Sequence, residues 1–460
     1  MTHATPTEPP AAHGRRQPSL ARLLTASAAG TVVETYDIIL TALVASLVFN
    51  HAFFPDIAPW IGTLAALGAA AIAYVGRPLG AIIFGWFGDK YSRLLALRVS
   101  ILGTGVATVA IGVIPTAATI GVWAPVLLVV LRLIQGISLG GEFGGATLVA
   151  MENAPPKRRF FYGTFASVGS MGGVALATIV VLVVTSAMGM ETFREWGWRV
   201  PFIASVLLIV VAYVARRIDE SAEFVEAKAA ADSAPELAKD SSVDGLSVLK
   251  RAVLVLAGIV MTVPTVSITY SLSTGMLPLV NAGGLPGISV TAYQIALVML
   301  SLVAIPISLY GGWLGTRYRP ELIIRIGAVW TAVAAFPVIW LLQSGSTVLL
   351  FVGMLLATPG YALVSGPAAA FVASALPVRL RYLGIGIAYA GAALVGGGVL
   401  PIVALAIAGE GYRTVLPFAC ILCGAGLVAL FATVFTKRAQ QAVARSAGLD
   451  DDLPEAASVG

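Results

Sequence analysis

Twelve long apolar stretches dominate this sequence, and their length restricts the folds that the chain can adopt. A helix rises about 1.5 Å per residue, so roughly 20 apolar residues cross a hydrocarbon core about 30 Å thick. Each stretch is therefore expected to form a helix that spans a membrane. The stretches cover residues 20–48, 61–87, 95–115, 123–151, 161–187, 199–216, 251–276, 290–315, 322–342, 346–373, 382–408 and 413–436.

The composition supports the same class of fold. Hydrophobic residues make up 58% of the chain and charged residues 11%, with a mean hydropathy of +0.92. A soluble protein needs a more polar surface. The net charge of +5 does not indicate nucleic-acid binding, because the basic residues form short clusters between the apolar stretches. The sequence therefore predicts an all-α membrane protein with twelve transmembrane helices.

The longest polar interval, residues 217–250, divides the stretches into two groups of six. We expect an N-terminal bundle over residues 20–216, a cytoplasmic linker over 217–250 and a C-terminal bundle over 251–436. Residues 1–19 and 437–460 are expected to be cytoplasmic tails.

A short motif recurs after the second helix of each half. Gly85-Trp is followed by a base, Lys90, five positions after the glycine. Gly312-Trp is followed at the same spacing by Arg317. This recurrence indicates an internal duplication, as in transporters built from two parallel six-helix repeats.

The distribution of basic residues predicts the orientation. Arg77 and Arg132 fall within the apolar stretches, and most of the other basic residues fall on one side of the predicted membrane. Only Arg194, Arg199 and Arg413 fall on the opposite side. Because cytoplasmic loops carry the excess of Lys and Arg, both termini are expected to be cytoplasmic.

Five charged residues lie deep inside the predicted spans, where a charge is costly and usually faces a partner or a wet cavity. Glu34 and Asp37 stand three apart on the first helix and therefore share a face. Counting residues from the helix ends predicts two layers. Asp37 and Arg132 form the outer layer, and Glu34, Glu142 and Arg77 form the inner one.

These five residues comprise three acids and two bases. A net negative charge in a desolvated site is unfavourable, so one carboxylate is expected to take up a proton readily. This arrangement favours proton coupling. The alternative is a purely structural network of salt bridges that holds helices 1, 2 and 4 together.

The second half carries no acidic or basic residue at a comparable depth. We expect its neutral polar residues to shape a pocket, although each could instead be a helix–helix or interfacial contact. They are Tyr270, Ser271, Ser273, Thr274, Asn281, Gln294, Tyr310, Tyr361 and Tyr389.

Several motifs resemble those of a known family. The loop from Gly85 to Arg93 resembles the loop 2–3 signature of the major facilitator superfamily, and Arg132-Leu-Ile-Gln135-Gly136 resembles its helix 4 signature. More selective stretches are similar to the metabolite:proton symporter family, which includes shikimate, 2-oxoglutarate, citrate and proline/betaine carriers. They are Glu34-Thr-Tyr36-Asp37, Gly76-Arg77-Pro78, Gly140-Gly141-Glu142, Trp196-Gly197-Trp198, Glu220-Ser221 and Arg379-Leu-Arg381.

The resemblance implies the major facilitator fold and uptake across a bacterial inner membrane driven by the proton gradient. It implies that Asp37 and Arg132 form a proton-linked gate. It also implies a cytoplasmic latch formed by Asp89, Arg93, Arg379 and Arg381.

The sequence departs from the family pattern at several positions. Thr35 replaces a Trp. At positions expected to face the pocket, Ala166-Ser167 replaces a Pro-Gln pair and Ala390 replaces an Asn. The substrate of a named family member is therefore not transferred to this chain.

We expect a proton-coupled importer of a small organic anion, because a guanidinium binds a carboxylate bidentately. Two alternatives stay open, a symporter of a zwitterion such as proline or betaine and an efflux antiporter for a small hydrophobic compound. The expected proton-coupling residues are Asp37, Arg132, Glu34 and Glu142. The expected substrate-binding residues are Arg77, Tyr36, Arg132, Ser167, Gln135, Tyr270 and Tyr389.

The sequence contains no Ser/His/Asp set, no metal-spaced His/Cys set and no phosphate-loop motif. We therefore expect no enzymatic activity, cofactor or metal. The expected partners are the substrate, protons and lipid, in a protein that acts as a monomer.

Overall fold

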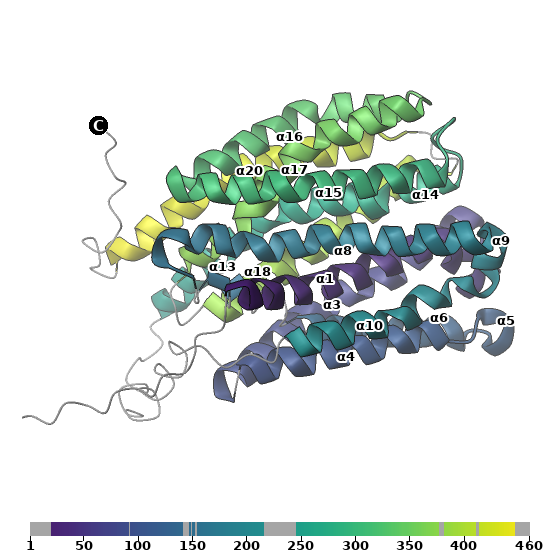
Figure 1. Ribbon diagram of the computed structural model, residues 1–460, viewed down its shortest axis with the longest axis horizontal. Coiled ribbons are helices and arrows are strands. Elements are labelled where there is room, and N and C mark those ends of the chain that lie inside the picture. The colour runs from purple at the N-terminus through teal and green to yellow at the C-terminus, as the bar shows by residue number, and fades with distance from the viewer. Residues whose placement is uncertain are drawn as a thin grey trace, which may run out of the picture.

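The computed structural model describes residues 20–91, 93–140, 147–148, 150–151, 154–215, 245–376, 381–410 and 414–446. All regular structure in this part of the chain is helical, and the long helices run roughly side by side along the long axis of the molecule (Figure 1). The all-α fold expected from the sequence is therefore confirmed.

The first half of the chain forms a series of helices joined by short connections. They are α1 (Leu20–Val44), η1 (Ala45–Phe49), α2 (Asn50–Phe53), α3 (Pro59–Lys90), α4 (Arg93–Val113), α5 (Ala117–Ile120), α6 (Trp123–Leu139), η2 (Pro156–Arg158), α8 (Arg159–Met188), α9 (Met190–Thr192), η3 (Phe193–Gly197) and α10 (Arg199–Ala215).

The second half follows the same plan. Its helices are α13 (Gly245–Tyr270), η4 (Ser271–Gly275), α14 (Leu277–Asn281), α15 (Val290–Arg317), α16 (Pro320–Leu342), α17 (Thr347–Ala375), α18 (Arg381–Ala392), η6 (Ala393–Val399), α19 (Leu400–Ala408) and α20 (Leu416–Ser446). Several helices reach a few residues beyond their predicted stretches. Two of the longer extensions are those of α13, which begins at Gly245 instead of residue 251, and of α20, which continues past residue 436 to Ser446.

Each predicted stretch overlaps an observed apolar helix. Ten helical segments of the described chain are long and apolar enough to cross a membrane. Met190–Gly197 and Arg199–Val214 form an eleventh span that is bent by 67°. The shorter apolar helix α6 belongs to the stretch predicted at 123–151, in which helical residues are described again at 147–148 and 150–151.

The helix α1 runs through the interior of the molecule. Its most apolar window is 94% buried, whereas the corresponding windows of the other nine long spans are between 44% and 56% buried. The other helices turn apolar side chains such as Val106, Leu207 and Val333 outward. Polar residues on α1 are therefore shielded from lipid on all sides, which positions them for a site inside the bundle.

Glycines bring α3 and α6 into close contact. A Cβ added to Gly136 would overlap the carbonyl oxygen of Ala73, and one added to Gly80 would overlap the carbonyl oxygen of Ile137. A Cβ on Gly140 would likewise collide with the carbonyl oxygen of Arg77. Small residues allow this backbone approach in membrane helices. The contact fixes the arginines of α3 and α6 beside α1.

The two halves touch at both ends of the bundle. At the end that carries η1 and α14, the Asn281 side chain donates a hydrogen bond to the carbonyl of Ser46 over 3.1 Å. Toward the opposite end, Gly163 packs against Ala370, and Gly312 packs against the hydroxyl of Thr164. The structure is therefore closed around its centre from both directions.

Three of the π-helical turns concern the centre of the molecule. Two of them occupy corresponding places in the two halves, and the third contacts the Tyr74 ring. The turn η1 follows α1, and η4 follows α13, so the first helix of each half widens before its final segment. The turn η6 lies within the span formed by α18 and α19, where Gly397 and Gly398 pack on the Tyr74 ring. A π turn releases backbone groups from the regular helical ladder and often occurs at functional sites.

Candidate functional site

Two buried ion pairs connect α1 with its neighbours. Glu34 and Asp37 on α1 are each 1% exposed. Arg132 Nη1 on α6 lies 3.3 Å from Asp37 Oδ2. Arg77 Nη2 on α3 lies 2.9 Å from Glu34 Oε1. The structure thus brings together four of the five charged residues that the sequence placed at depth, and Glu142 lies outside the described residues.

Asp37 is the centre of a hydrogen-bond network that joins three helices. Its Oδ1 accepts hydrogen bonds from Thr108 on α4 over 2.7 Å and from Gln135 on α6 over 2.5 Å. Its Oδ2 accepts a hydrogen bond from Arg132 over 3.3 Å. Protonation would remove the negative charge that these donors face and would leave weaker acceptors in its place. Asp37 thus connects α1 with α4 and α6 through contacts whose strength depends on its charge.

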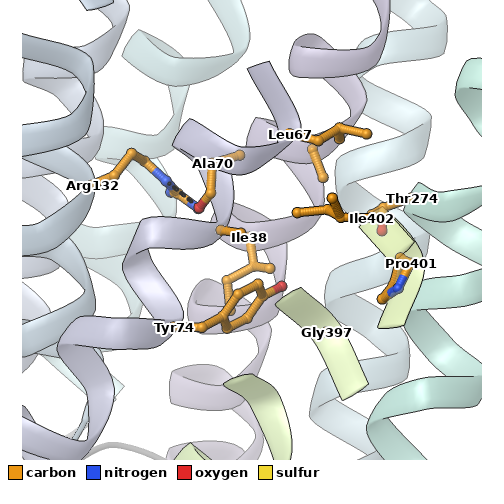
Figure 2. A pocket seen from close by; sticks show the side chains of 11 residues that line it. Ile38, Leu67, Ala70, Tyr74, Arg132, Thr274, Gly397, Pro401 and Ile402 are labelled. Atoms are coloured by element: carbon orange, nitrogen blue, oxygen red, sulfur yellow. Dashed lines mark hydrogen bonds between the residues drawn. The ribbon is translucent and has the colours of Figure 1, made fainter. Parts of the chain in front are cut away.

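Arg132 is fully engaged by backbone and side-chain acceptors. Its Nε and Nη2 both donate to the carbonyl of Ala70 on α3, over 3.1 and 3.0 Å (Figure 2). Its Nη1 also donates to Thr41 over 3.1 Å and to Gln135. A small cavity of about 20 Å³ adjoins this side chain, with the Tyr74 ring on its wall. That volume accommodates a water molecule and no organic substrate.

Arg77 has a different environment. Its guanidinium lies 5.4 Å from the centroid of the Tyr74 ring and 5.6 Å from that of Tyr389, so aromatic faces hold it on two sides. Nη2 is paired with Glu34, whereas Nε and Nη1 make no hydrogen bond of good geometry to the described part of the chain. Buried polar groups are nearly always hydrogen-bonded. Arg77 therefore retains donors that an additional anion can use.

A cavity lined by hydroxyl groups lies beside the Arg77 site, between the two halves. Thr35 of α1 and Ser167 and Ser170 of α8 form one wall. Hydroxyl-bearing residues of α13, α17 and α18, including Tyr361 and Tyr389, form the other. The cavity volume is about 30 Å³, which holds water molecules only. A substrate can occupy this place only after the halves move apart.

Of the other predicted substrate-binding residues, three line this cavity and two do not. Tyr270 and Tyr389 line the hydroxyl cavity, and Ser167 lines it while donating to the carbonyl of Ser365 over 2.9 Å. Gln135 belongs to the Asp37 network. The Tyr36 hydroxyl instead donates to the carbonyl of Pro201 on α10 over 2.9 Å.

The predicted cytoplasmic latch lies largely beyond what the structure describes. Arg379 is outside the described residues. Asp89, Arg93 and Arg381 fall within helices, but their side chains are not described. The latch therefore stays an expectation.

Two neutral residues expected at the pocket lie elsewhere. Asn281 is at the end of α14, where it contacts Ser46 and accepts a hydrogen bond from Arg194 over 3.3 Å. Tyr310 is 58% exposed on the outer surface of α15 and stacks on Trp313.

Sequence reasoning missed several residues of the site. Thr108 had no distinguishing signal, since hydroxyl residues are common in these helices. Thr269 could have been found, because the Thr35-Tyr36 pair of α1 recurs as Thr269-Tyr270 of α13. In this internally duplicated chain, such a recurrence marks corresponding positions of the two halves.

Comparisons with known proteins agree with this architecture. Residues 23–397 match the family model described as Major Facilitator Superfamily. A putative metabolite transport protein of Haemophilus influenzae is 36% identical over 401 residues, which cover 85% of this chain and 88% of the relative. The shikimate transporter of Escherichia coli is 34% identical over 391 residues, covering 83% and 86%.

More distant relatives and solved structures also match over most of the chain. The proline/betaine transporter of Escherichia coli is 29% identical over 392 residues, which cover 82% of this chain and 76% of that transporter. A solved structure of the proton:xylose symporter XylE has a TM-score of 0.71, with 14% sequence identity, and the match covers 91% of this chain and 95% of that chain. At that identity the structural match establishes the fold.

Proposed function

The chain belongs to the major facilitator superfamily of membrane transporters, and we propose that it imports a small organic anion together with protons by alternating access. It is a multi-pass membrane protein. We propose further that it acts as a monomer in a bacterial inner membrane with both termini on the cytoplasmic side, as the distribution of basic residues indicates.

The environment of Arg77 carries this proposal. The side chain is 1% exposed, yet beyond its ion pair with Glu34 its Nε and Nη1 make no hydrogen bond of good geometry to the described residues. A planar guanidinium matches a carboxylate through two parallel N–H···O hydrogen bonds. A substrate carboxylate that approaches from the neighbouring cavity, past Tyr389, would satisfy these donors.

The position of Glu34 supplies a physical reason for proton coupling. Glu34 lies 2.9 Å from Arg77 and neutralises it while no substrate is bound. A substrate carboxylate at Arg77 would place two anions against one cation in a desolvated site, which is unfavourable. Protonation of Glu34 removes one of these negative charges. Proton and substrate therefore bind together, which is the requirement for symport.

The Asp37–Arg132 pair provides a second protonation point. We propose that Asp37 acts as a proton-linked gate, because its carboxylate holds α1 to α4 and α6 through Thr108, Gln135 and Arg132. Loss of the negative charge frees α1 to move relative to both helices. Because Arg132 also donates to the carbonyl of Ala70 on α3, it stays in place when α1 moves.

Uptake into proteoliposomes tests the proposal. A radiolabelled carboxylate should accumulate when the outside is acidic, and a protonophore should abolish the accumulation. Arg77→Gln should abolish binding and uptake, whereas Glu34→Gln should bind substrate and exchange it without accumulation. Arg317→Gln removes an exposed arginine of α15 and serves as the matched control. Uptake that is indifferent to the proton gradient would exclude symport.

Symport of a zwitterion is the second candidate, because relatives at 29% identity are proline/betaine transporters. A zwitterion would present its carboxylate to Arg77 in the same way and differ at its cationic end. Competition by proline and glycine betaine against a labelled organic acid distinguishes the two. Competition by betaine at lower concentration than any acid would favour the zwitterion.

A further inference from the structure

Two of the three side chains that hydrogen-bond to the Asp37 carboxyl group can only donate to it. Arg132 faces Oδ2 through Nη1 over 3.3 Å, and a guanidinium has no acceptor. Gln135 faces Oδ1 through its amide nitrogen, Nε2, over 2.5 Å. Within the described part of the chain Arg132 is the one charged side chain that contacts Asp37, since Glu34 and Arg77 form a separate pair. An ionised carboxylate, which only accepts, fits these two donors.

The amide of Gln135 is held in this orientation by its other end. Its Oε1 accepts a hydrogen bond from Arg132 Nη1. A rotated amide would place its NH2 group against the guanidinium, so that two donors would face each other without an acceptor, which is costly in a buried site. Gln135 therefore remains a donor to Oδ1 whether or not Asp37 carries a proton.

A protonated Asp37 needs an acceptor as well as donors. A neutral carboxyl group carries one O–H group, and a buried donor that is left unpaired costs free energy. Asp37 is 1% exposed, and it does not line the small cavity beside Arg132. The Thr108 hydroxyl lies 2.7 Å from Oδ1. It is the one group among the described hydrogen-bond partners of this carboxyl that can accept as well as donate.

The Thr108 hydroxyl also has a second acceptor for its own hydrogen. Its Oγ1 lies 2.8 Å from the carbonyl oxygen of Thr104, one turn earlier on α4. A hydroxyl has one hydrogen and two lone pairs. When the hydrogen points to Thr104, the lone pairs are available to Asp37 and to Gln135 Nε2, which is 2.7 Å away. The hydroxyl then uses its full capacity for hydrogen bonds.

We propose that Thr108 is the positioning residue for the coupled proton, because it donates to ionised Asp37 and accepts from protonated Asp37. This inference rests on the proposed function and deepens the role of Asp37 in it. On proton uptake from water, the new O–H bond forms at Asp37 Oδ1, and the hydroxyl hydrogen of Thr108 turns from Oδ1 to the carbonyl of Thr104. No covalent bond of Thr108 breaks. The proton returns to water when the hydroxyl turns back.

Infrared difference spectroscopy tests this hydrogen bond directly. Spectra of the purified full-length protein in liposomes, recorded at acidic and at alkaline pH, should contain a C=O stretching band of protonated Asp37 that is absent in Asp37→Asn. In Thr108→Val the carboxyl O–H group loses its acceptor, so this band should move to higher wavenumber. Thr108→Ser keeps a hydroxyl at the same place and should keep the wild-type band.

Transport by the same variants provides the second test. Valine has nearly the shape of threonine, but Thr108→Val leaves the O–H group of neutral Asp37 unpaired. Accumulation of the labelled substrate should therefore fall about tenfold, and Thr108→Ser should retain it to within about twofold. Thr178→Val on α8 is the matched control. The buried Thr178 hydroxyl donates to the carbonyl of Val174 over 2.8 Å, as that of Thr108 does to Thr104, and contacts no carboxylate among the described residues. This control should change neither the band nor the uptake.

The outcomes separate this inference from the proposed function. A band that stays in place in Thr108→Val, or a wild-type spectrum without an Asp37 band, overturns the role of Thr108; proton-dependent uptake by the wild type would then leave the symport proposal intact. Equal loss of uptake in Thr108→Val and Thr108→Ser also overturns it, because it assigns the threonine to packing. Wild-type uptake that is indifferent to the proton gradient overturns the proposed function, and the coupling role of Thr108 falls with it. A band shift and a loss of uptake in Thr108→Val, both absent in Thr108→Ser, support the inference.

Discussion

The close contact between α3 and α6 leads to a quantitative prediction for Gly136→Ala. A Cβ at this position would overlap the carbonyl oxygen of Ala73, and a helix backbone cannot rotate away as a flexible side chain can. Overpacking costs about 1–3 kcal/mol, and a clash with backbone belongs at the upper end. The higher helix propensity of alanine returns about 1 kcal/mol. The net loss of stability is therefore expected to be about 2 kcal/mol.

Thermal unfolding measures this loss. One kcal/mol shifts Tm by roughly 2–4 °C in a domain the size of one six-helix bundle, so Gly136→Ala should lower Tm by roughly 4–8 °C. Intrinsic tryptophan fluorescence follows the transition in detergent, at one heating rate for all variants because unfolding of such proteins is often irreversible. Gly68→Ala on α3 is the control, since its Cβ would meet no atom within 4 Å. This control should melt at or slightly above the wild-type temperature.

The same substitution should impair transport. A shift of α6 away from α3 lengthens the hydrogen bonds from Arg132 to the carbonyl of Ala70, which are now 3.0 and 3.1 Å. The Asp37 network depends on that position of Arg132, so the rate of uptake should fall in Gly136→Ala and persist in Gly68→Ala. A Gly136→Ala protein that melts like Gly68→Ala and transports normally would refute the tight contact and the reasoning built on it.

Three further predictions concern the charged centre and the closed end. Asp37→Asn should lower accumulation at least about tenfold while substrate exchange continues, as counterflow measurements would show, because the network keeps its shape but loses its charge. Wild-type uptake should fall as the external pH rises. Glu34→Gln should weaken the pH dependence of exchange and leave only the part that Asp37 contributes; a pH profile identical to that of the wild type would contradict the role of Glu34. Asn281→Ala removes the hydrogen bond to the carbonyl of Ser46, so amide hydrogen exchange in the η1 segment should become about fivefold faster. Arg194→Ala removes only the contact between Arg194 and Asn281, so it should accelerate exchange in η1 less.

The fold could be predicted largely from the sequence, because membrane spans require long apolar runs. The twelve-helix major facilitator fold and the expectation of transport rather than enzymatic activity are confirmed by the family match and the relatives. The ends of helices were less predictable. Residues 245–250 of α13 are polar enough to read as linker, yet a helix can continue beyond the apolar core.

The candidate site could be predicted in part. Charge and the three-residue spacing pointed to Glu34, Asp37, Arg77 and Arg132, and the structure brings these side chains together in two pairs. The partner of Arg77 could not be derived, because both Glu34 and Glu142 were at a compatible depth. The structure pairs Arg77 with Glu34, and Glu142 lies outside the described residues.

Asn281 shows a different limit of sequence reasoning. Asn281 lies beyond the stretch predicted at 251–276, and the span continues through the π turn η4 and α14 to this residue. A π turn inserts an extra residue and rotates everything that follows. Asn281 consequently lies at the junction with Ser46 and Arg194 rather than at the pocket.

The paired turns η1 and η4 also determine how one end of the molecule can open. Each lies beyond the charged centre, and each has a carbonyl that is held by a side chain from elsewhere, Ser46 by Asn281 and Leu272 by Tyr293. Breaking such a contact allows the terminal segment to tilt about its wide turn while the preceding helix stays still. If the protein works as we propose, access from that side changes while the geometry of Glu34 and Asp37 is kept, and protonation of these carboxylates does not depend on which end of the molecule is open.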